Sequence, residues 1–368
     1  MLAALDVLDD PAALAAGDPE DMLAAVAGAG AQLRAGTAAA IRERVGAASD
    51  WAGPRALVVA GMGGSAAAGD VLVAVAAESV IPIVVHRGYG LPSWVGPNDM
   101  VAAVSCSGQT EETLSAVAEA VRRGIRLVTV GGAGSDLATA AVRAGGLHVD
   151  VDAAGRQPRA CLWSLAGPLL CLGEALGLVA VRAEVAAAAA DLLDTTARCC
   201  APEASAVVNP AKSLAGHLFD GLPMVWGFTE VAAAAAARFG NQLAENAKVP
   251  AVVGARTEPH HNQVVAFDAA RAGGPAGQLR LVVLRDSVED PRLARRAEES
   301  GRLADQLGLP VAQVRAEGEH PLVRLAGLTG VLDFASIYLA LALRVDPTPV
   351  APIGTLKARL AAADPGAA

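Results

Sequence analysis

Two glycine- and hydroxyl-rich segments have the residue types needed to bind a phosphate monoester. Gly61–Ser65 (GMGGS) carries three glycines, which let the backbone approach a ligand closely. Ser105–Thr113 (SCSGQTEET) places several hydroxyls around one turn. Because each segment precedes a predicted helix, the free backbone N–H groups of that helix would face the same ligand. The residues that we expect to bind phosphate are Gly63, Gly64, Ser65, Ser105, Ser107, Gly108 and Thr110.

Each segment also has an ordinary structural interpretation. Glycine-rich turns follow strands in many folds, and a Ser or Thr ahead of Glu111 and Glu112 is the usual N-cap pattern. Neither segment has the spacing G-x-G-x-x-G or G-x-x-x-x-G-K, which disfavours NAD and ATP as ligands. Since both segments follow strands of one predicted sheet, they meet at its carboxyl edge, and this favours a shared site.

The elements around these segments alternate between strand and helix. Short apolar runs predict strands at 56–60, 81–86, 100–105, 126–130 and 147–151, with a helix at 110–123 after the second segment. The second half repeats this theme less regularly. It follows a long apolar helix at 160–178 and has predicted strands at 223–227, 251–253, 279–284 and 311–314, with helices at 230–249, 291–307, 321–343 and 352–362. Apolar strands joined by helices are typical of parallel sheets covered on both faces.

The length of 368 residues favours two domains over one core, so we predict an α/β chain with domains at 1–180 and 181–368. The net charge of −9 argues against a general nucleic-acid binder, although a few local donors can still bind one phosphate. Five cysteines without a C-x-x-C pair suggest neither a disulfide framework nor a zinc site. The acidic N-terminus and the short apolar runs predict a soluble, cytoplasmic protein without a signal peptide or membrane partner.

The two segments belong to a longer series that resembles the bifunctional phosphoglucose/phosphomannose isomerases. The series continues with GRQPRA at 155–160, GNQLAENAKVPA at 240–251, HHNQVVAF at 260–267 and DPTPVAPIGTLKARL at 346–360. It spans nearly the whole chain, in the order found in the family. The resemblance implies two flavodoxin-like sugar isomerase (SIS) domains, each a parallel sheet sandwiched by helices, with a sugar phosphate bound at the edge of the first sheet.

The same resemblance implies a reaction and its residues. Glucose 6-phosphate and/or mannose 6-phosphate would be interconverted with fructose 6-phosphate through a cis-enediol(ate), without a metal or other cofactor. Glu245 matches the catalytic base, and His261 matches a histidine that helps to open the sugar ring. Arg159 matches an arginine that stabilises the enediolate, and Lys357 matches a lysine near the substrate oxygens. A homodimer with His261 donated across the interface, and a role in glycolysis and gluconeogenesis, are implied as well.

Several alternatives remain open at this point. Glu245 could be a surface acid paired with Lys248, and the other three residues could be ordinary surface or loop residues. A zinc-dependent isomerase is disfavoured, because the six histidines form no metal-binding pair. A non-catalytic sugar-phosphate sensor and a weakened homologue are the other candidates. Gln109, Cys106 and Ala66 stand where the family often has asparagine, an aromatic residue and serine, which could change substrate preference or activity.

Overall fold

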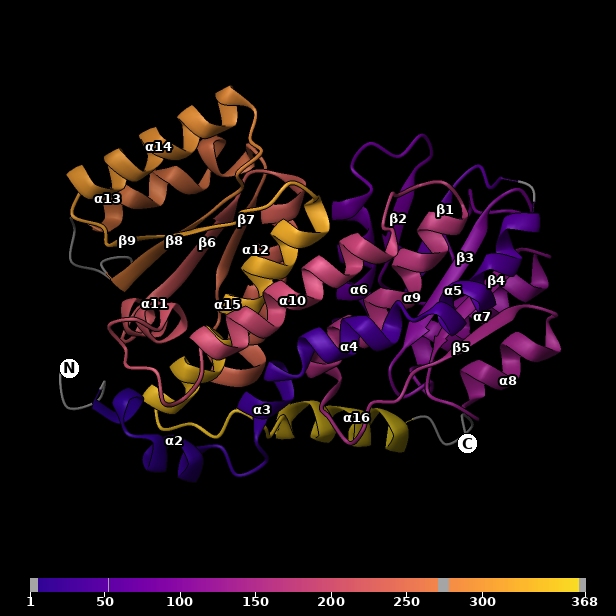
Figure 1. Ribbon diagram of the computed structural model, residues 1–368, viewed down its shortest axis with the longest axis horizontal. Helices are drawn as coiled ribbons and strands as arrows, with labels where there is room; N and C mark the ends of the chain where they lie inside the picture. The colour runs from indigo at the N-terminus through magenta and orange to yellow at the C-terminus, as the bar shows by residue number, and fades with distance from the viewer. Residues whose placement is uncertain (1–5, 52, 271–277, 364–368) are drawn as a thin grey trace.

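Two parallel β-sheets lie at opposite ends of the molecule, with a layer of long helices between them (Figure 1). The computed structural model describes residues 6–51, 53–270 and 278–363. The predicted α/β class with two helix-covered parallel sheets is confirmed. The predicted boundary near residue 180 stays a prediction, because one continuous apolar core reaches from one sheet to the other.

The first sheet has the strand order β2-β1-β3-β4-β5, and every neighbouring pair is parallel. This is the order of flavodoxin-like folds. Its strands are β1 (Leu57–Ala60), β2 (Ile83–His86), β3 (Met100–Ser105), β4 (Arg126–Gly131) and β5 (Leu147–Asp150), and the helices that follow β1, β3 and β4 are α6 (Gly63–Val75), α7 (Glu111–Arg122) and α8 (Asp136–Arg143). β1 and β3 are buried along their whole length, which explains their continuous apolar sequences.

The second sheet is smaller and has the order β7-β6-β8-β9, again all parallel. Its strands are β6 (Leu222–Gly227), β7 (Val252–Ala255), β8 (Leu279–Arg285) and β9 (Val311–Arg315). Its helices are α11 (Pro210–Leu218), α12 (Glu230–Gln242), the short α13 (Ala266–Ala270) and α14 (Pro291–Gln306). The charged sequence of α14 fits its place on the outside of this sheet (Figure 1).

The layer between the sheets is built from α9 (Leu162–Ala175), α10 (Ala183–Cys199) and α15 (Pro321–Ala342), with α6 and α12 packed against it. α15 is long and apolar enough to cross a membrane, but 83% of its most apolar window is buried inside the protein. It is therefore accounted for as a core helix. An apolar helix buried on all sides is expected where two sheets share one core.

Short helices at both ends of the chain complete the fold. The N-terminal ones are η1 (Asp6–Asp9), α2 (Pro11–Gly17), α3 (Met22–Ala27), α4 (Ala29–Gly36), α5 (Ala39–Gly46) and η2 (Ala47–Asp50). α4 crosses α9 closely, because a Cβ atom on Gly36 would stand 3.2 Å from the Cα atom of Gly167. The C-terminal helix α16 (Ala351–Ala363) runs along one edge of the molecule (Figure 1), and its described side chains are exposed.

The predicted helix at 230–249 is the most informative departure from the sequence-based boundaries. α12 ends at Gln242, and the chain continues through one turn of π-helix at Leu243–Ala247. Lys248 then adopts the left-handed conformation, with a φ of 59°. Similarly, the predicted helix at 160–178 is preceded by a 3₁₀ turn, η3 (Pro158–Ala160), before α9 begins. Both irregular turns carry predicted site residues, and π-turns occur frequently at functional sites.

Candidate active site

Both predicted phosphate-binding segments lie at the point where the strand order of the first sheet reverses. The first follows β1 and the second follows β3, and these two strands are neighbours. In open parallel sheets, ligands bind in the crevice at such a reversal, outside the carboxyl ends of the strands. The sheet therefore brings the two segments together as the sequence predicts.

The loop after β1 leads directly into the N-terminus of α6. Gly63 has a φ of 50°, which favours glycine, and a Cβ atom on Gly64 would stand 3.0 Å from the carbonyl oxygen of Pro158. The helix has no side-chain cap, so its first N–H groups can face a ligand. Ser65 Oγ accepts a hydrogen bond from the backbone N–H of Cys106 at 3.2 Å, which ties this loop to the second.

The loop after β3 is shaped by its own hydroxyls. Ser105 Oγ lies 2.9 Å from Thr110 Oγ1 and accepts the N–H of Gly108 at 3.0 Å. Thr110 occupies the N-cap position of α7, yet its side chain makes no capping bond. The N-cap interpretation holds for the position of Thr110 and for the acids Glu111 and Glu112 in the first turn, but the capping bond itself is absent, because the hydroxyl of Thr110 faces Ser105 instead of the helix. The first N–H groups of α7 have no side-chain cap to satisfy them.

Ser107 is exposed, and its Oγ accepts the N–H of Gln109 at 3.2 Å. The hydroxyls of Ser65 and Ser107 act only as acceptors among the described residues, so their protons can be donated to a bound oxyanion. Gly108 has a φ of 68°, and a Cβ atom there would meet Ser135 Oγ at 2.1 Å. Ser135, the N-cap of α8, thus supports the loop from behind, which sequence inspection did not reveal.

Arg159 links the phosphate-binding loops to the C-terminal half of the chain. A Cβ atom on Gly64 would stand 3.4 Å from the Cα atom of Arg159, which places the arginine beside the first loop. Its Nε donates to Asn246 Oδ1 at 2.7 Å, and its Nη2 donates to the carbonyl oxygens of Pro347 and Thr348 at 2.9 and 2.7 Å. Burial lowers the pKa of this guanidinium. The side chain is therefore a fixed, dehydrated cation.

The remaining nitrogen of that guanidinium faces Glu245. Arg159 Nη1 lies 3.8 Å from Glu245 Oε2, and the Glu245 side chain is 29% exposed. Glu245 stands in the π-helical turn, which ends where Lys248 bends the chain. Lys248 Nζ donates to the backbone carbonyl of Glu245 at 2.6 Å. The alternative of a surface Glu245–Lys248 carboxylate pair is therefore wrong: the carboxylate has Arg159 as its cationic neighbour.

A buried polar network holds this arginine in place. Arg238 donates to both carboxylate oxygens of Asp333, at 2.9 and 2.7 Å, and to the carbonyl oxygen of Arg159 at 3.0 Å. Asn246 Nδ2 donates to Ser336 Oγ at 2.9 Å. Sequence analysis missed this network. Its signal was present, because Arg238, Gln242 and Asn246 recur every fourth residue along an otherwise alanine-rich helix.

The structure does not bring His261 to Glu245 within one chain. Glu245 precedes β7 and His261 follows it, so they lie at opposite ends of a strand that alone spans about 10 Å. His261 is exposed and makes no hydrogen bond to another described residue. The neighbouring His260 is held by Ser300 Oγ, 2.8 Å from its Nε2, and stacks on Phe228 with ring centroids 4.7 Å apart. His260 is therefore held by its neighbours, whereas the His261 side chain is free to contact a ligand or another subunit.

Lys357 lies on the exposed helix α16 and has no described partner. The segment before α16 is close to the site, since Pro347 and Thr348 accept from Arg159. The helix itself is exposed, and its side chains Ile353, Leu356 and Leu360 are 45%, 58% and 61% exposed. Within one chain, the structure therefore assembles the phosphate loops, Arg159 and Glu245, but not His261 or Lys357.

The second sheet has no comparable cradle at its own reversal point, between β6 and β8, in the part of the chain that the structure describes. A carboxylate, Asp286, occupies the end of β8 and accepts from Thr229 Oγ1 at 3.0 Å. Arg324 Nε lies 2.6 Å from the same carboxylate, and both side chains are buried. The Asp286 carboxylate therefore already occupies the Thr229 hydroxyl and the Arg324 guanidinium, which could otherwise bind a phosphate. The candidate phosphate site therefore belongs to the first sheet.

Replacing Ser107 by alanine is expected to weaken binding of inorganic phosphate about tenfold, because one hydrogen bond to a charged group is lost from an exposed position. Isothermal titration calorimetry with inorganic phosphate measures this change directly. Ser49→Ala, which alters an exposed serine bonded to the carbonyl of Gly46, is the matched control and should bind phosphate as the wild type does. Equal affinities for Ser107→Ala and the wild type would contradict the assignment.

Comparisons with known proteins agree with this geometry. Residues 207–360 match the family described as the bacterial phospho-glucose isomerase C-terminal SIS domain. The chain is 33% identical over 308 residues to the bifunctional phosphoglucose/phosphomannose isomerase of Caldicellulosiruptor bescii, covering 83% of this chain and 89% of that protein. It is 28% identical to the enzyme of the same name from Thermoplasma acidophilum, covering 83% and 89%.

Solved structures share the fold at lower identity. A hypothetical protein from Thermus thermophilus superposes with a TM-score of 0.73 at 19% identity, over 96% of this chain and 94% of that one. The C-terminal domain of glucosamine-fructose-6-phosphate aminotransferase from Francisella tularensis gives 0.62 at 14% identity, over 90% and 96%. These solved structures show the fold, and the sequence relatives named above establish that the chain belongs to the bifunctional phosphoglucose/phosphomannose isomerase family and is a phosphosugar isomerase.

Proposed function

We propose that the protein interconverts glucose 6-phosphate and mannose 6-phosphate with fructose 6-phosphate through an enediolate, with Glu245 as the base and without a metal. The observation that carries this proposal is the placement of Arg159. It touches the phosphate loop at Gly64 and reaches to within 3.8 Å of the Glu245 carboxylate. A sugar held by its phosphate can thus present its other end to a carboxylate and a cation together.

Each group has a chemical task in this proposal. The loop hydroxyls and the N-termini of α6 and α7 bind the phosphate. Glu245 removes a proton from the carbon next to the carbonyl group and returns it to the former carbonyl carbon. Arg159 stabilises the negative oxygen that develops meanwhile, because its Nη1 is the guanidinium nitrogen left without a hydrogen bond to a described protein atom. A planar enediolate reprotonated on either face would give both aldoses.

The proposal includes a metal-free reaction because a carboxylate and a fixed cation supply the base and the oxyanion stabiliser. In the described part of the chain, no group of three or more His, Cys, Asp or Glu side chains is arranged to hold a metal ion. The test measures fructose 6-phosphate formed from each aldose by the wild type in excess EDTA. Turnover of both sugars at the untreated rate is expected. Loss of activity in EDTA that zinc or another divalent ion restores would contradict the metal-free mechanism.

We further propose a homodimer in which the partner subunit supplies His261 for ring opening and Lys357 near the sugar oxygens. This assignment is supported by the exposure of both residues and by the separation of His261 from Glu245 within one chain. The apolar side chains of α16, exposed and spaced at helical intervals, are also suited to cover a second copy. Such an interface would be isologous, so each dimer would hold two equivalent sites.

Shared sites can be tested by complementation between two inactive variants. Heterodimers of one Glu245→Gln subunit and one His261→Asn subunit, purified through two different tags, are expected to have about half the wild-type activity, because one of their two sites is intact. Either homodimer should be far less active. Heterodimers no more active than the two homodimers would show that each site is built within one chain.

The proposed setting is the cytoplasm, with the enzyme serving glycolysis and gluconeogenesis and binding neither nucleic acid nor membrane. The free cysteines of the described residues and the net charge of −9 support this setting.

A further inference from the structure

Lys248 adopts an unusual backbone conformation directly after the turn that carries the proposed base. Its φ of 59° and ψ of 27° lie in the left-handed region, which glycine and asparagine adopt readily and lysine does not. A residue held in this region despite its side chain is a candidate for a functional role. The ordinary explanation is that left-handed residues end many helices. The contacts of the Lys248 side chain decide between the two.

Arg344 shows what the ordinary case looks like. It follows the C-terminus of α15 with a φ of 57°, and its exposed side chain makes no hydrogen bond or ion pair with another described residue. Lys248, in contrast, is bonded to two separate parts of the chain. Its Nζ donates to the carbonyl oxygen of Glu245 at 2.6 Å and to that of Pro347 at 3.3 Å. The two left-handed cations therefore differ in their side-chain contacts and not in their backbone.

The two carbonyls joined by Lys248 belong to the segments that carry the base and hold the arginine. The Pro347 carbonyl also accepts a hydrogen bond from Arg159 Nη2 at 2.9 Å, so the two cations share one acceptor. Partial desolvation and then the nearby charge of Arg159 lower the pKa of Lys248. A lysine that serves only solubility keeps its ammonium in water. This one lies beside another cation instead, where its two hydrogen bonds hold it.

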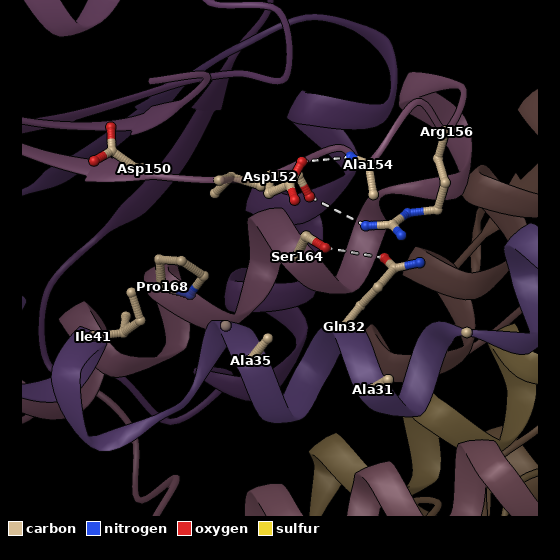
Figure 2. Close-up of a pocket in the computed structure, with 13 residues that line it drawn as sticks. Ala31, Gln32, Ala35, Ile41, Asp150, Asp152, Ala154, Arg156, Ser164 and Pro168 are labelled. Carbon is tan, nitrogen blue, oxygen red and sulfur yellow. Dashed lines mark hydrogen bonds between the residues drawn. The ribbon is translucent and has the colours of Figure 1, made fainter. Parts of the chain in front are cut away.

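The turn that carries Arg159 is fixed without Lys248. Gln32, a buried residue of α4, donates from its Nε2 to the carbonyl oxygen of Ala160 at 2.8 Å. Its Oε1 accepts a hydrogen bond from Ser164 Oγ at 3.4 Å, so both ends of the amide are held (Figure 2). Together with the buried polar network described above, this bond anchors the arginine from behind. Loss of Lys248 should therefore disturb Glu245 more than Arg159.

The Glu245 carboxylate has no comparable anchor. It makes no hydrogen bond with another described residue, and its cationic neighbour Arg159 Nη1 is 3.8 Å away. The backbone of the π-turn therefore sets the direction of the carboxylate. That turn is closed where the backbone N–H of Lys248 donates to the carbonyl of Leu243, and the ammonium then ties it to Pro347.

We propose that Lys248 is a positioning residue of the isomerase. Its ammonium ties the carbonyl of Glu245 to that of Pro347, and this tie directs the Glu245 carboxylate at the carbon that loses its proton. Lys248 itself does not touch the substrate. The inference rests on the proposed function, because it needs Glu245 as the base. It adds a residue to which the family resemblance assigned no role.

Lys248→Met keeps the length of the side chain and the left-handed strain but removes the ammonium. We expect kcat to fall about tenfold to a hundredfold, since a misplacement of about 1 Å can cost about a hundredfold in rate. KM and the calorimetric affinity for inorganic phosphate should stay within about twofold, because the phosphate loops have their own hydrogen bonds. Lys248→Arg, which can donate to both carbonyls, should keep most of the wild-type kcat.

Lys248→Gly separates the effect on activity from the effect on stability. Glycine adopts the left-handed conformation without strain, so this variant should unfold at a higher urea concentration than Lys248→Met. Its kcat should nevertheless be as low, because the ammonium is missing in both. Arg344→Gly relieves the same strain at the end of α15 and is the matched control, which should keep full activity. Recovery of kcat along with stability in Lys248→Gly would overturn the proposal.

A double variant tests whether Lys248 acts through Glu245. Glu245→Gln combined with Lys248→Met should be no more than about twofold slower than Glu245→Gln alone, because Lys248 then has no base to position. Two losses that multiply would overturn the proposal. So would a Lys248→Met enzyme with unchanged kcat, whether its KM is unchanged or raised, since a raised KM alone is the mark of a substrate-binding residue.

These outcomes differ from a failure of the proposed function. Wild-type turnover in Glu245→Gln would show that Glu245 is not the base, and the role of Lys248 would fall with it. A large loss in Glu245→Gln together with full activity in Lys248→Met would leave the proposed function intact and reject the positioning role alone.

Discussion

Glu245→Gln is expected to lower kcat about a thousandfold for both aldose phosphates and to leave KM nearly unchanged. Glutamine has the shape of glutamate but cannot accept a proton at neutral pH, and positioned bases of this kind contribute about 10²–10⁴-fold to rates. KM should change little because the phosphate loops, which supply ground-state binding, lie on another part of the chain. Steady-state assays in both directions measure the effect.

The variant should fold normally, which makes the kinetic loss interpretable. The Glu245 carboxylate is partly exposed, and its one cationic neighbour, Arg159 Nη1, is 3.8 Å away and so not hydrogen bonded. We expect the free energy of unfolding to change by less than about 1 kcal/mol. Glu230→Gln, at the opposite end of α12 and paired with Arg256, is the matched control and should keep full activity.

A second measurement asks what Glu245 does. If it transfers the proton, fructose 6-phosphate incubated in deuterated water with the wild type should gain deuterium at the carbon that Glu245 reprotonates, and the variant should show almost no exchange. Retention of wild-type exchange with lost isomerisation would mean that another residue is the base. In that case the proposal would fail although the fold and the phosphate site remained.

The part of the site built on the first sheet could be predicted from the sequence for a simple reason. A parallel strand buried on both faces is a continuous apolar run, so the ends of β1 and β3 are visible as the points where apolar residues give way to glycine and serine. The order of the strands then forces both loops to one edge. Local pattern and global topology carry the same information here, and Ser65 and Ser105 lie where the pattern places them.

The environment of Glu245 could not be predicted in this way. A helix-end glutamate three residues before a lysine looks like a surface pair, and periodicity predicts an unbroken helix. The π-turn and the left-handed Lys248 redirect both side chains, and Arg159 arrives from 86 residues earlier in the chain. The network behind it needs Asp333 and Ser336 of α15, which no local pattern connects with Asn246.

Neither the family resemblance nor the structure of a single chain explains how His261 and Lys357 would reach the active site. The resemblance assigned a role to each, and the chain places each on its surface without a described contact to the carboxylate that they would assist. The difference between these residues and Arg159 is physical: the arginine is fixed by buried partners within the chain, whereas the other two have none among the described residues. A second subunit is the simplest source of the missing contacts, and the heterodimer experiment tests it.

Arg159→Lys is expected to lower kcat about 10²- to 10³-fold, the second largest effect after that of Glu245→Gln. A lysine cannot bind Asn246, Pro347 and Thr348 at once and still direct a free donor at the substrate, because it lacks the planar array of five N–H groups. The phosphate loops do not depend on the guanidinium for their own hydrogen bonds, so affinity for inorganic phosphate should stay within about twofold.

Arg159 is buried, so the variant also loses stability, and the control must separate this loss from catalysis. Arg324→Lys provides that control. Arg324 is similarly buried and paired with Asp286, but at the end of the second sheet, away from the phosphate loops. Both variants should be destabilised by a few kcal/mol in urea unfolding, since each weakens a buried polar network. Only Arg159→Lys should lose kcat at temperatures where both remain folded. If both variants lost activity in proportion to their stability, Arg159 would be a structural residue and the developing charge would need another stabiliser.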